Sequence, residues 1–325
     1  MLTRRRFLRL GGQALAVLPF LSALPAAAAG PSSLVFAGPP APLSLPLARL
    51  GDQPGFGAAV EMRQWRTPDI MRSWLVSGEV QVSGVPANAA AILYNKGLPV
   101  RLLDVNNGGI LSLLTRDPSI TKLADVRGKK VLLFYRGDIP DMITRFLAQR
   151  QGLNLDKDAQ VSYAGSPFEA LQMLLSKRAD TVLLPEPAAT AAELKGKGAG
   201  MAFTRIALQD VWREVTGTDM FLPLGGTVCQ ASLAKESPDT VREIEAGMGQ
   251  AVEWINAHPA GAGKAYAGLF GLQAPVLQKS LERFPLRRTP AREARAGLEF
   301  YYKALMEMSP KLVGGKLPDE GFYLG

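Results

Sequence analysis

The sequence predicts an α/β fold in which mainly parallel sheets form two lobes. The first observation is a repeated alternation of short apolar segments with helical segments whose apolar residues share one face. The second is a proline near the first turn of helix after helix, where its missing N–H would have no helical partner in any case. The third is the lack of a flexible linker, which suggests that strands carry the chain between the lobes and act as a hinge.

The N-terminal segment is expected to be an export signal. Residues 3–9 read Thr-Arg-Arg-Arg-Phe-Leu-Arg, the layout of a twin-arginine signal, and a modest apolar stretch with a run of alanines follows to residue 29. The stretch contains glycines and a proline and is short for a membrane span. We therefore expect a signal peptide over residues 1–29, export by the twin-arginine (Tat) machinery and a periplasmic protein.

The charge balance argues against nucleic acid as a partner. The chain has 37 basic and 29 acidic residues, and residues 1–29 hold four arginines and no acidic residue. Without that segment, 33 basic residues remain against 29 acidic ones, a net charge of +4. So mild and interspersed an excess predicts no nucleic-acid binding.

The first part of the chain after residue 30 alternates strand and helix. Helices are expected to begin near Leu45, Pro68 and Pro86. Because parallel strands end at the edge of the sheet where the following helices begin, the loops between these elements are the expected ligand-binding loops. The strands are expected at residues 34–37, 60–65, 80–84 and 100–105.

The segment from 123 to 187 repeats the pattern with clear punctuation at each joint. A helix is expected after the loop that begins at Arg136, and a second helix has Ser166 as its N-cap. Glu169 is expected to complete a capping box with Ser166. The strands are expected at residues 131–134, 161–163 and 181–184.

The last part of the chain is mainly helical. A long helix is expected from Ser237 to His258, and two apolar segments are candidate crossings between the lobes, Ile110–Leu114 and Thr227–Gln230. Further helices are expected near residues 260–271, 273–283 and 290–308.

Several motifs in a fixed order carry a family resemblance. They are Trp65, Ser77-Gly78-Glu79, Gly84-Val85-Pro86, the run from Leu123 to Lys130, and Leu183-Leu184-Pro185-Glu186-Pro187. Together they resemble the substrate-binding proteins of ABC transporters, in the branch that serves nitrate, sulfonate, taurine, bicarbonate and thiamine precursors. The resemblance covers about residues 33–323.

The resemblance implies a type II periplasmic binding protein with a two-strand hinge that closes on its ligand like a clamshell. Lobe 1 would comprise residues 30–113 and 228–325, and lobe 2 residues 114–227. The closed form would dock on an ABC permease, with its ATPase at the inner membrane. No cofactor and no enzymatic activity are implied for such a protein.

The candidate ligand-binding residues are those in the loops at strand ends and at the helix starts. The sequence leaves two roles open for Trp65, packing on a ligand or packing in the core. For Arg66 and Arg136 it leaves open whether they pair with an anion or lie exposed. Glu186 suits a hydrogen-bond acceptor or an interlobe contact better than a general base. The full set is Gly38, Pro39, Trp65, Arg66, Thr67, Gly84, Pro86, Asn88, Asn106, Arg136, Asp138, Ser166 and Glu186.

Catalysis has little support in the sequence. His258 is the only histidine and Cys229 the only cysteine, so neither a zinc site nor a Cys–His or Ser–His pair is expected. The prediction is a binding protein, with the ligand open between an oxyanion such as a sulfonate, nitrate or bicarbonate and a small heterocycle. The alternatives are an enzyme on the same scaffold acting on a pyrimidine or tetrapyrrole precursor, and a periplasmic sensor subunit.

Overall fold

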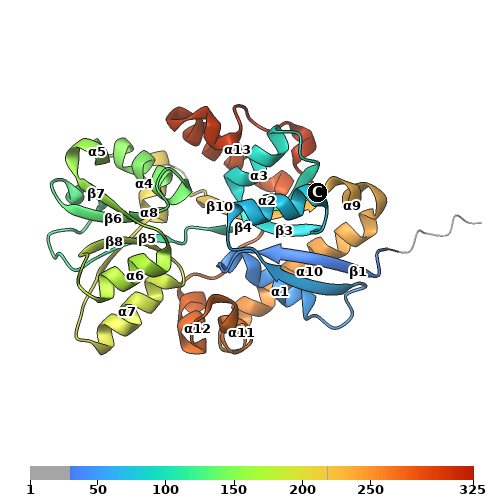
Figure 1. Ribbon diagram of the computed structural model, residues 1–325, viewed down its shortest axis with the longest axis horizontal. Helices are drawn as coiled ribbons and strands as arrows, with labels where there is room; N and C mark the ends of the chain where they lie inside the picture. The colour runs from blue at the N-terminus through green and yellow to red at the C-terminus, as the bar shows by residue number, and fades with distance from the viewer. Residues whose placement is uncertain (1–29, 218) are drawn as a thin grey trace, which may run out of the picture.

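The structure has the two α/β lobes that the sequence predicts, each built on its own sheet (Figure 1). The computed structural model describes residues 30–217 and 219–325. The predicted signal over residues 1–29 therefore lies outside the described residues. Among the residues described, no helix is both long enough and apolar enough to cross a membrane.

The first sheet, in lobe 1, has six strands in the order β11-β4-β10-β3-β1-β2. They are β1 (Ser33–Gly38), β2 (Ala59–Gln64), β3 (Val82–Pro86), β4 (Val100–Gly108), β10 (Pro223–Gln230) and β11 (Thr289–Pro290). The second sheet, in lobe 2, has five strands in the order β7-β6-β8-β5-β9. They are β5 (Leu111–Thr115), β6 (Lys130–Phe134), β7 (Gln160–Ala164), β8 (Thr181–Pro185) and β9 (Thr204–Ala207).

Helices cover both sheets, and prolines stand in the first turn of many of them, as the sequence predicts. The helices of lobe 1 are η1 (Pro42–Ser44), α1 (Leu45–Gly51), α2 (Pro68–Ser77), α3 (Ala87–Asn95), α9 (Ala231–Glu236), α10 (Pro238–Ala257), α11 (Pro259–Tyr266), η3 (Ala267–Phe270), α12 (Ala274–Arg283), α13 (Ala291–Met308), η4 (Pro310–Val313) and η5 (Glu320–Phe322). Those of lobe 2 are η2 (Leu123–Val126), α4 (Ile139–Arg150), α5 (Leu155–Asp158), α6 (Pro167–Leu175), α7 (Ala188–Gly198) and α8 (Leu208–Thr216).

The strand directions place the carboxyl edges of the two sheets opposite each other. In lobe 1, β3 and β4 are both antiparallel to β10, and β1 and β2 run with β3, so these four strands end beside the point where β4 leaves for lobe 2. In lobe 2, β8 is antiparallel to β5, with Pro185 opposite Leu111, and β6 and β7 run with β8. We call these two edges the facing edges.

The chain passes between the sheets at residues 109–110 and again between α8, which ends at Thr216, and β10, which begins at Pro223. The first passage meets the candidate crossing Ile110–Leu114 at Ile110, because β5 begins at Leu111. The second passage precedes the candidate crossing Thr227–Gln230, because β10 already begins at Pro223. We therefore propose residues 30–108 and 223–325 as lobe 1 and residues 111–216 as lobe 2.

Two glycines allow the two passages to run side by side. A Cβ on Gly108 would lie 2.2 Å from the Leu222 carbonyl oxygen and 2.5 Å from the ring of Phe221, so only glycine fits there. The next residue, Gly109, has a φ of 63° and donates its N–H to the same carbonyl at 3.3 Å. The hinge is thus a close contact between two backbone segments.

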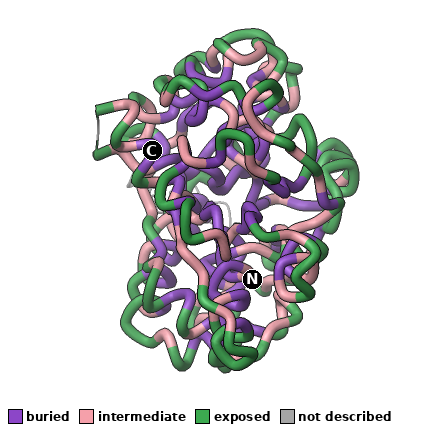
Figure 2. The backbone as a smooth tube through the Cα atoms, turned by 90° about the vertical axis from the view of Figure 1, so that its left-hand side faces the viewer, coloured by how far each residue is buried: buried purple, intermediate pink, exposed green. Residues whose placement is uncertain are grey.

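A cluster of aromatic side chains packs α13 of lobe 1 onto lobe 2. Trp212 of α8 is fully buried, and its ring lies 6.1 Å from Phe146 of α4. On the other side it meets Phe300 at 5.6 Å and Tyr301 at 6.3 Å, both on α13. Figure 2, seen from the side of lobe 2, shows buried segments running through the middle of the molecule. Burying large apolar side chains contributes about 1.5–3 kcal/mol each, so this contact stabilises the joint between the lobes.

Local signals explain where the helices begin, with two differences from expectation. Ser166 accepts a hydrogen bond from the N–H of Glu169 at 3.1 Å, as a capping box requires. The Glu169 carboxylate, however, accepts from the N–H of Gly165 at 2.7 Å rather than from that of Ser166. Ser237 occupies the N-cap position of α10 but makes no side-chain capping bond.

Cys229 is expected to be unreactive while the protein is folded. It is fully buried in β10, and this burial raises the pKa of its thiol to about 12, so little thiolate is present to act as a nucleophile. We expect a disulfide reagent such as 5,5′-dithiobis(2-nitrobenzoate) to modify the thiol only after unfolding in guanidinium chloride. Rapid modification of the native protein, with unchanged circular dichroism, would contradict this burial.

Candidate functional site

The residues that the sequence predicts as ligand contacts lie at or near the facing edges. Each lies near the end of a strand, in the loop after that strand or in the first turn of the helix that follows. From lobe 1 these are Gly38, Pro39, Trp65, Arg66, Thr67, Gly84, Pro86, Asn88 and Asn106, and from lobe 2 Arg136, Asp138, Ser166 and Glu186. Their convergence depends on strand direction alone, and their side chains differ widely in what they contact.

Trp65 and Gly84 form part of the core of lobe 1. The Trp65 side chain is 7% exposed, and its Nε1 donates to the Gly84 carbonyl at 3.2 Å. Trp74 on α2 is half-buried, and the Arg63 guanidinium lies 5.9 Å from the centre of its ring. Of the two tryptophans, Trp65 is therefore the more deeply packed, and its polar atom is already paired.

Most of the small polar residues at the facing edges serve as helix caps. Thr67 accepts from the N–H of Ile70 at 3.4 Å, and Asp138 accepts from the N–H of Ile139 at 2.8 Å. Asn88 is buried and donates to a carbonyl of η4 at 3.2 Å. Thr67 and Asp138 thus satisfy backbone N–H groups that would otherwise be orphaned at the helix starts, whereas Asn88 caps no helix start and bonds to η4 instead.

The two predicted anion-binding arginines are exposed. No ion pair joins Arg66 to a described carboxylate, whereas the Arg136 guanidinium lies 5.5 Å from the ring centre of Tyr163. Arg136 lines a hollow of about 450 Å³ in lobe 2. The deepest charges of that hollow belong to Asp141 and Arg145, which pair with each other at 2.7 Å.

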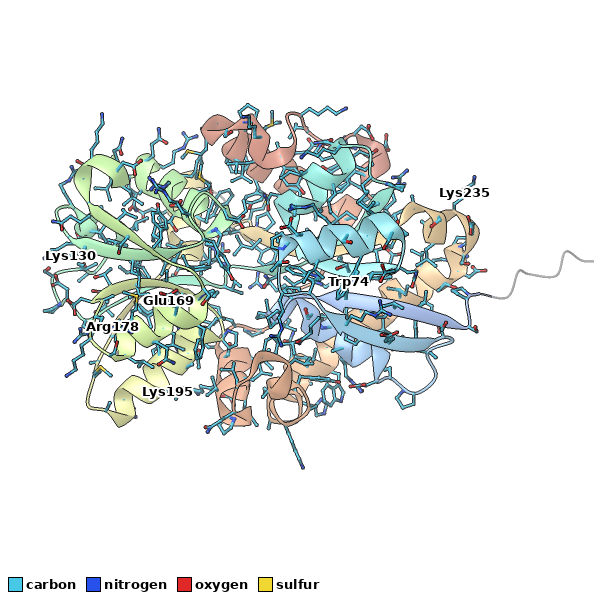
Figure 3. The ribbon with its side chains drawn as sticks, in the orientation of Figure 1. Trp74, Lys130, Glu169, Arg178, Lys195 and Lys235 are labelled. Atoms are coloured by element: carbon cyan, nitrogen blue, oxygen red, sulfur yellow. The ribbon has the colours of Figure 1, made fainter. Side chains whose placement is uncertain are left out.

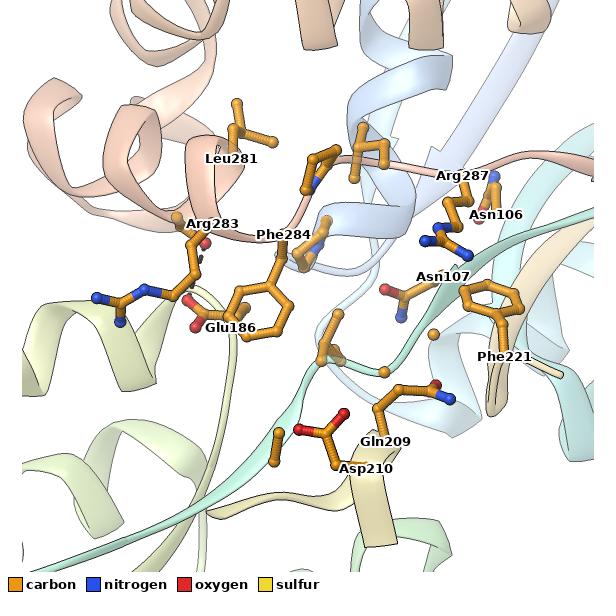
Figure 4. Close-up of a pocket in the computed structure, with 18 of the residues that line it drawn as sticks. Asn106, Asn107, Glu186, Gln209, Asp210, Phe221, Leu281, Arg283, Phe284 and Arg287 are labelled. Carbon is orange, nitrogen blue, oxygen red and sulfur yellow. Dashed lines mark hydrogen bonds between the residues drawn. The ribbon is translucent and has the colours of Figure 1, made fainter. Parts of the chain in front are cut away.

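A cavity of about 270 Å³ lies at the hinge between the lobes (Figure 4). Its walls come from the end of β4, the end of β8, the start of α8, the second passage between the sheets and the segment that follows α12. Two of the predicted residues, Asn106 and Glu186, line it. The other lining residues are Pro42, Asn107, Gly108, Gly109, Ile110, Ala207, Gln209, Asp210, Arg213, Phe221, Leu277, Ser280, Leu281, Arg283, Phe284, Pro285, Leu286 and Arg287.

Glu186 connects the two lobes across this cavity. Its side chain is 1% exposed and accepts from the Arg205 guanidinium at 2.6 Å and from the hydroxyl of Ser280 on α12 at 2.8 Å. Arg205 also pairs with Glu193 at 2.9 Å, and Arg283 of α12 pairs with the other oxygen of Glu193. Glu186 is thus an acceptor and an interlobe contact, the roles that its place at a strand end favours.

A buried ion pair holds the segment after α12 against the first sheet. Arg288 donates to Asp104 at 2.8 Å, and Asp104 also accepts from the N–H of Thr227 at 3.2 Å. Asp104 is completely buried, and desolvation raises the pKa of its carboxyl despite the neighbouring guanidinium. This pair fixes residues 284–288, which cover one side of the cavity.

Several cavity residues carry no recognisable signal in the sequence. Phe221 and Phe284 come from irregular segments that follow neither a strand nor a helix start, and Ser280 lies inside an ordinary amphipathic helix. The only local sign is the Phe284-Pro285 pair, since a proline tends to end the helix before it. Their roles depend on α12 packing against α7, a contact between segments far apart in the chain.

Neither the histidine nor the cysteine of the sequence is among the residues that line this cavity. His258 stacks on Trp254 with ring centres 5.2 Å apart, next to the end of α10. Within residues 30–217 and 219–325, no cluster of three or more histidine, cysteine, aspartate or glutamate side chains could hold a metal ion.

Removing the Glu186 carboxylate is expected to destabilise the protein strongly. In Glu186→Ala, Arg205 would stay buried with only Glu193 as a partner, and Ser280 would lose its acceptor. Breaking a buried pair in this way costs about 3 kcal/mol, to be measured as a lower urea midpoint. Arg72→Ala, which breaks an exposed pair with Asp69, is the control and should cost under about 1 kcal/mol. Equal losses in the two variants would contradict a structural role for Glu186.

Solved structures with this fold include several solute-binding proteins. An ABC transporter protein from Parabacteroides distasonis is 22% identical, with a TM-score of 0.76 over 90% of this chain and 99% of that one. The periplasmic aliphatic sulphonate-binding protein SsuA from Escherichia coli is 17% identical, with a TM-score of 0.68 over 91% and 95%. The periplasmic nitrate-binding protein NrtA from Synechocystis PCC 6803 is 13% identical, with a TM-score of 0.61 over 86% and 82%.

Sequence comparison gives the family. No curated protein matches the chain. The family model described as NMT1/THI5 like matches residues 59–262, more than half of the chain. The chain therefore belongs to the NMT1/THI5-like family and has the two-lobed fold of the periplasmic binding proteins.

Proposed function

We propose that this protein is an exported solute-binding protein that captures a small molecule between its lobes and delivers it to an ABC importer. The observation that carries the proposal is the cavity at the hinge, whose walls come from both lobes. A solute bound there contacts residues of both lobes at once, so its binding energy favours the closed arrangement over an open one. The chemistry required of the protein is binding alone.

The size and lining of the cavity support a small solute. Pockets for drug-sized ligands usually span about 300–1,000 Å³, and this cavity is near the lower limit at about 270 Å³. Its lining mixes apolar side chains with a few polar groups, the usual composition of a site that binds by burial and orients by hydrogen bonding.

The proposed partners follow from the fold and the family. The closed form would present both lobes to an ABC permease, whose ATPase drives import at the inner membrane. The sulphonate-binding and nitrate-binding proteins that share this fold support a role beside an importer. Periplasmic location and Tat export rest on the motif in residues 3–9.

Thermal unfolding of the purified protein against a solute panel tests this function. A solute at about 100 times its dissociation constant adds about 2.7 kcal/mol to the stability of a protein that binds it only when folded. We expect a shift of several degrees with one chemical class, and recovery of the compound unchanged by mass spectrometry.

The control is Lys130→Ala, because Lys130 lies on the side of lobe 2 that faces away from lobe 1 (Figure 3). This variant should show the same shift as the unmodified protein. Recovery of a chemically altered compound would replace the proposal with an enzyme. A panel without any shift would contradict solute capture.

A further inference from the structure

Two asparagines in the hinge cavity have acceptor atoms without a partner. Asn106 is 1% exposed and donates its Nδ2 to Thr227 at 3.0 Å, which leaves its Oδ1 free. Asn107 is 5% exposed, and its Oδ1 likewise has no hydrogen-bond partner among the described residues. Buried polar atoms are nearly always paired, because an unpaired one keeps the cost of leaving water. Both atoms belong to residues that line one cavity, so a molecule bound there would complete both of them.

The walls beside these asparagines are flat and apolar. Asn107 lies between the rings of Phe284 and Phe221 in Figure 4. Gly108 and Gly109 follow directly and add no side chains. A small planar group is the shape that two aromatic walls and a bare backbone segment accommodate best.

The charged groups around the cavity are almost all paired with one another. Glu186 is held by Arg205 and Ser280, as described above. Asp210 pairs with Arg213 at 3.3 Å. Arg283 pairs with Glu193 outside the cavity.

Arg287 is the one lining cation that carries no ion pair among the described residues. It is exposed, so water screens its charge, although Figure 4 shows it beside Asn106 and Asn107. The two asparagines themselves offer a solute uncharged hydrogen-bonding groups.

Two helix starts on the facing edge of lobe 2, those of α4 and α6, already use their backbone donors within the chain. The N–H of Gly137 donates to Asp141 at 2.8 Å, and the N–H of Gly165 donates to Glu169 at 2.7 Å. The N–H of Ile139 donates to Asp138. At these two helix starts the carboxylates of this chain would repel an oxyanion.

We propose that the solute is uncharged and carries an amide-type group, whose N–H donors bind the side-chain carbonyls of Asn106 and Asn107. This inference rests on the proposed function and names its ligand class. An amide pairs with an asparagine side chain in either orientation of that side chain, because each partner has N–H donors and a carbonyl acceptor. Nitrate or a sulfonate offers acceptors alone and would place its oxygens against the Oδ1 of Asn106, whose Nδ2 already donates to Thr227.

Pairs of probes with the same shape and different charge test this proposal by thermal unfolding. The pairs are benzamide with benzoate, nicotinamide with nicotinate and acetamide with acetate, with nitrate, bicarbonate and methanesulfonate added as simple oxyanions. We expect a shift with the amide of at least one pair and none with its carboxylate. A shift with an oxyanion or a carboxylate and none with the amides overturns the proposal, while leaving solute binding intact. No shift with any probe overturns both.

Three variants then assign the contact. With the amide that binds, Asn107→Leu should weaken affinity at least about tenfold, because it removes the acceptor. Asn107→Asp keeps acceptor oxygens and should retain the shift, and Arg136→Ala should leave it unchanged. Loss of binding in Arg136→Ala with none in Asn107→Leu would place the solute elsewhere. The thermal unfolding midpoint of each variant without solute shows whether that variant is folded. The probe pairs are measured on the unmodified protein, so that test does not depend on any variant.

Discussion

The arrangement of both lobes depends on the close contact of two backbone segments at the hinge. Gly108 lies so near Leu222 and Phe221 that no side chain fits, and Gly109 turns the chain with a positive φ. This contact sets where β4 ends and β5 begins. Because all other strands are aligned with these two through hydrogen bonds, it also fixes which ends of the two sheets face each other.

The joint has two sides of different chemistry, and this difference bears on motion. On one side Trp212 packs among aromatic rings of both lobes, a contact that opening would expose to water at a cost in free energy. On the other side, Glu186 and Glu193 meet Ser280 and Arg283 through polar bonds that water can replace. The aromatic side is therefore suited to remain together as a pivot while the polar side separates.

The sequence predicts the order of strands and helices well because its signals are local. Proline and a hydroxyl or carboxylate at helix starts act within one turn. Ser166 caps its helix where the sequence places it, and Thr67 and Asp138 act in the same way at two further helix starts. The exact passages between lobes depend on how far β4 and β10 stay paired, which is a long-range property. The partners of Trp65 and Glu186 are likewise set by segments distant in the chain, so a sequence pattern leaves their roles open.

The chemical class of the ligand is also hard to predict from the sequence. An arginine before a helix start suggests anion binding from sequence, because the pattern gives charge and position but not the groups nearby. The Arg136 side chain is exposed to solvent, whereas the neighbouring backbone N–H groups of Gly137 and Ile139 donate to the carboxylates of Asp141 and Asp138. Asn107 carries no charge and no motif, yet it is buried at the hinge with an unpaired acceptor. Burial makes the free-energy cost of an unpaired atom large, whereas solvent makes the effect of an exposed charge small, and the proposal of an amide-type solute rests on this difference.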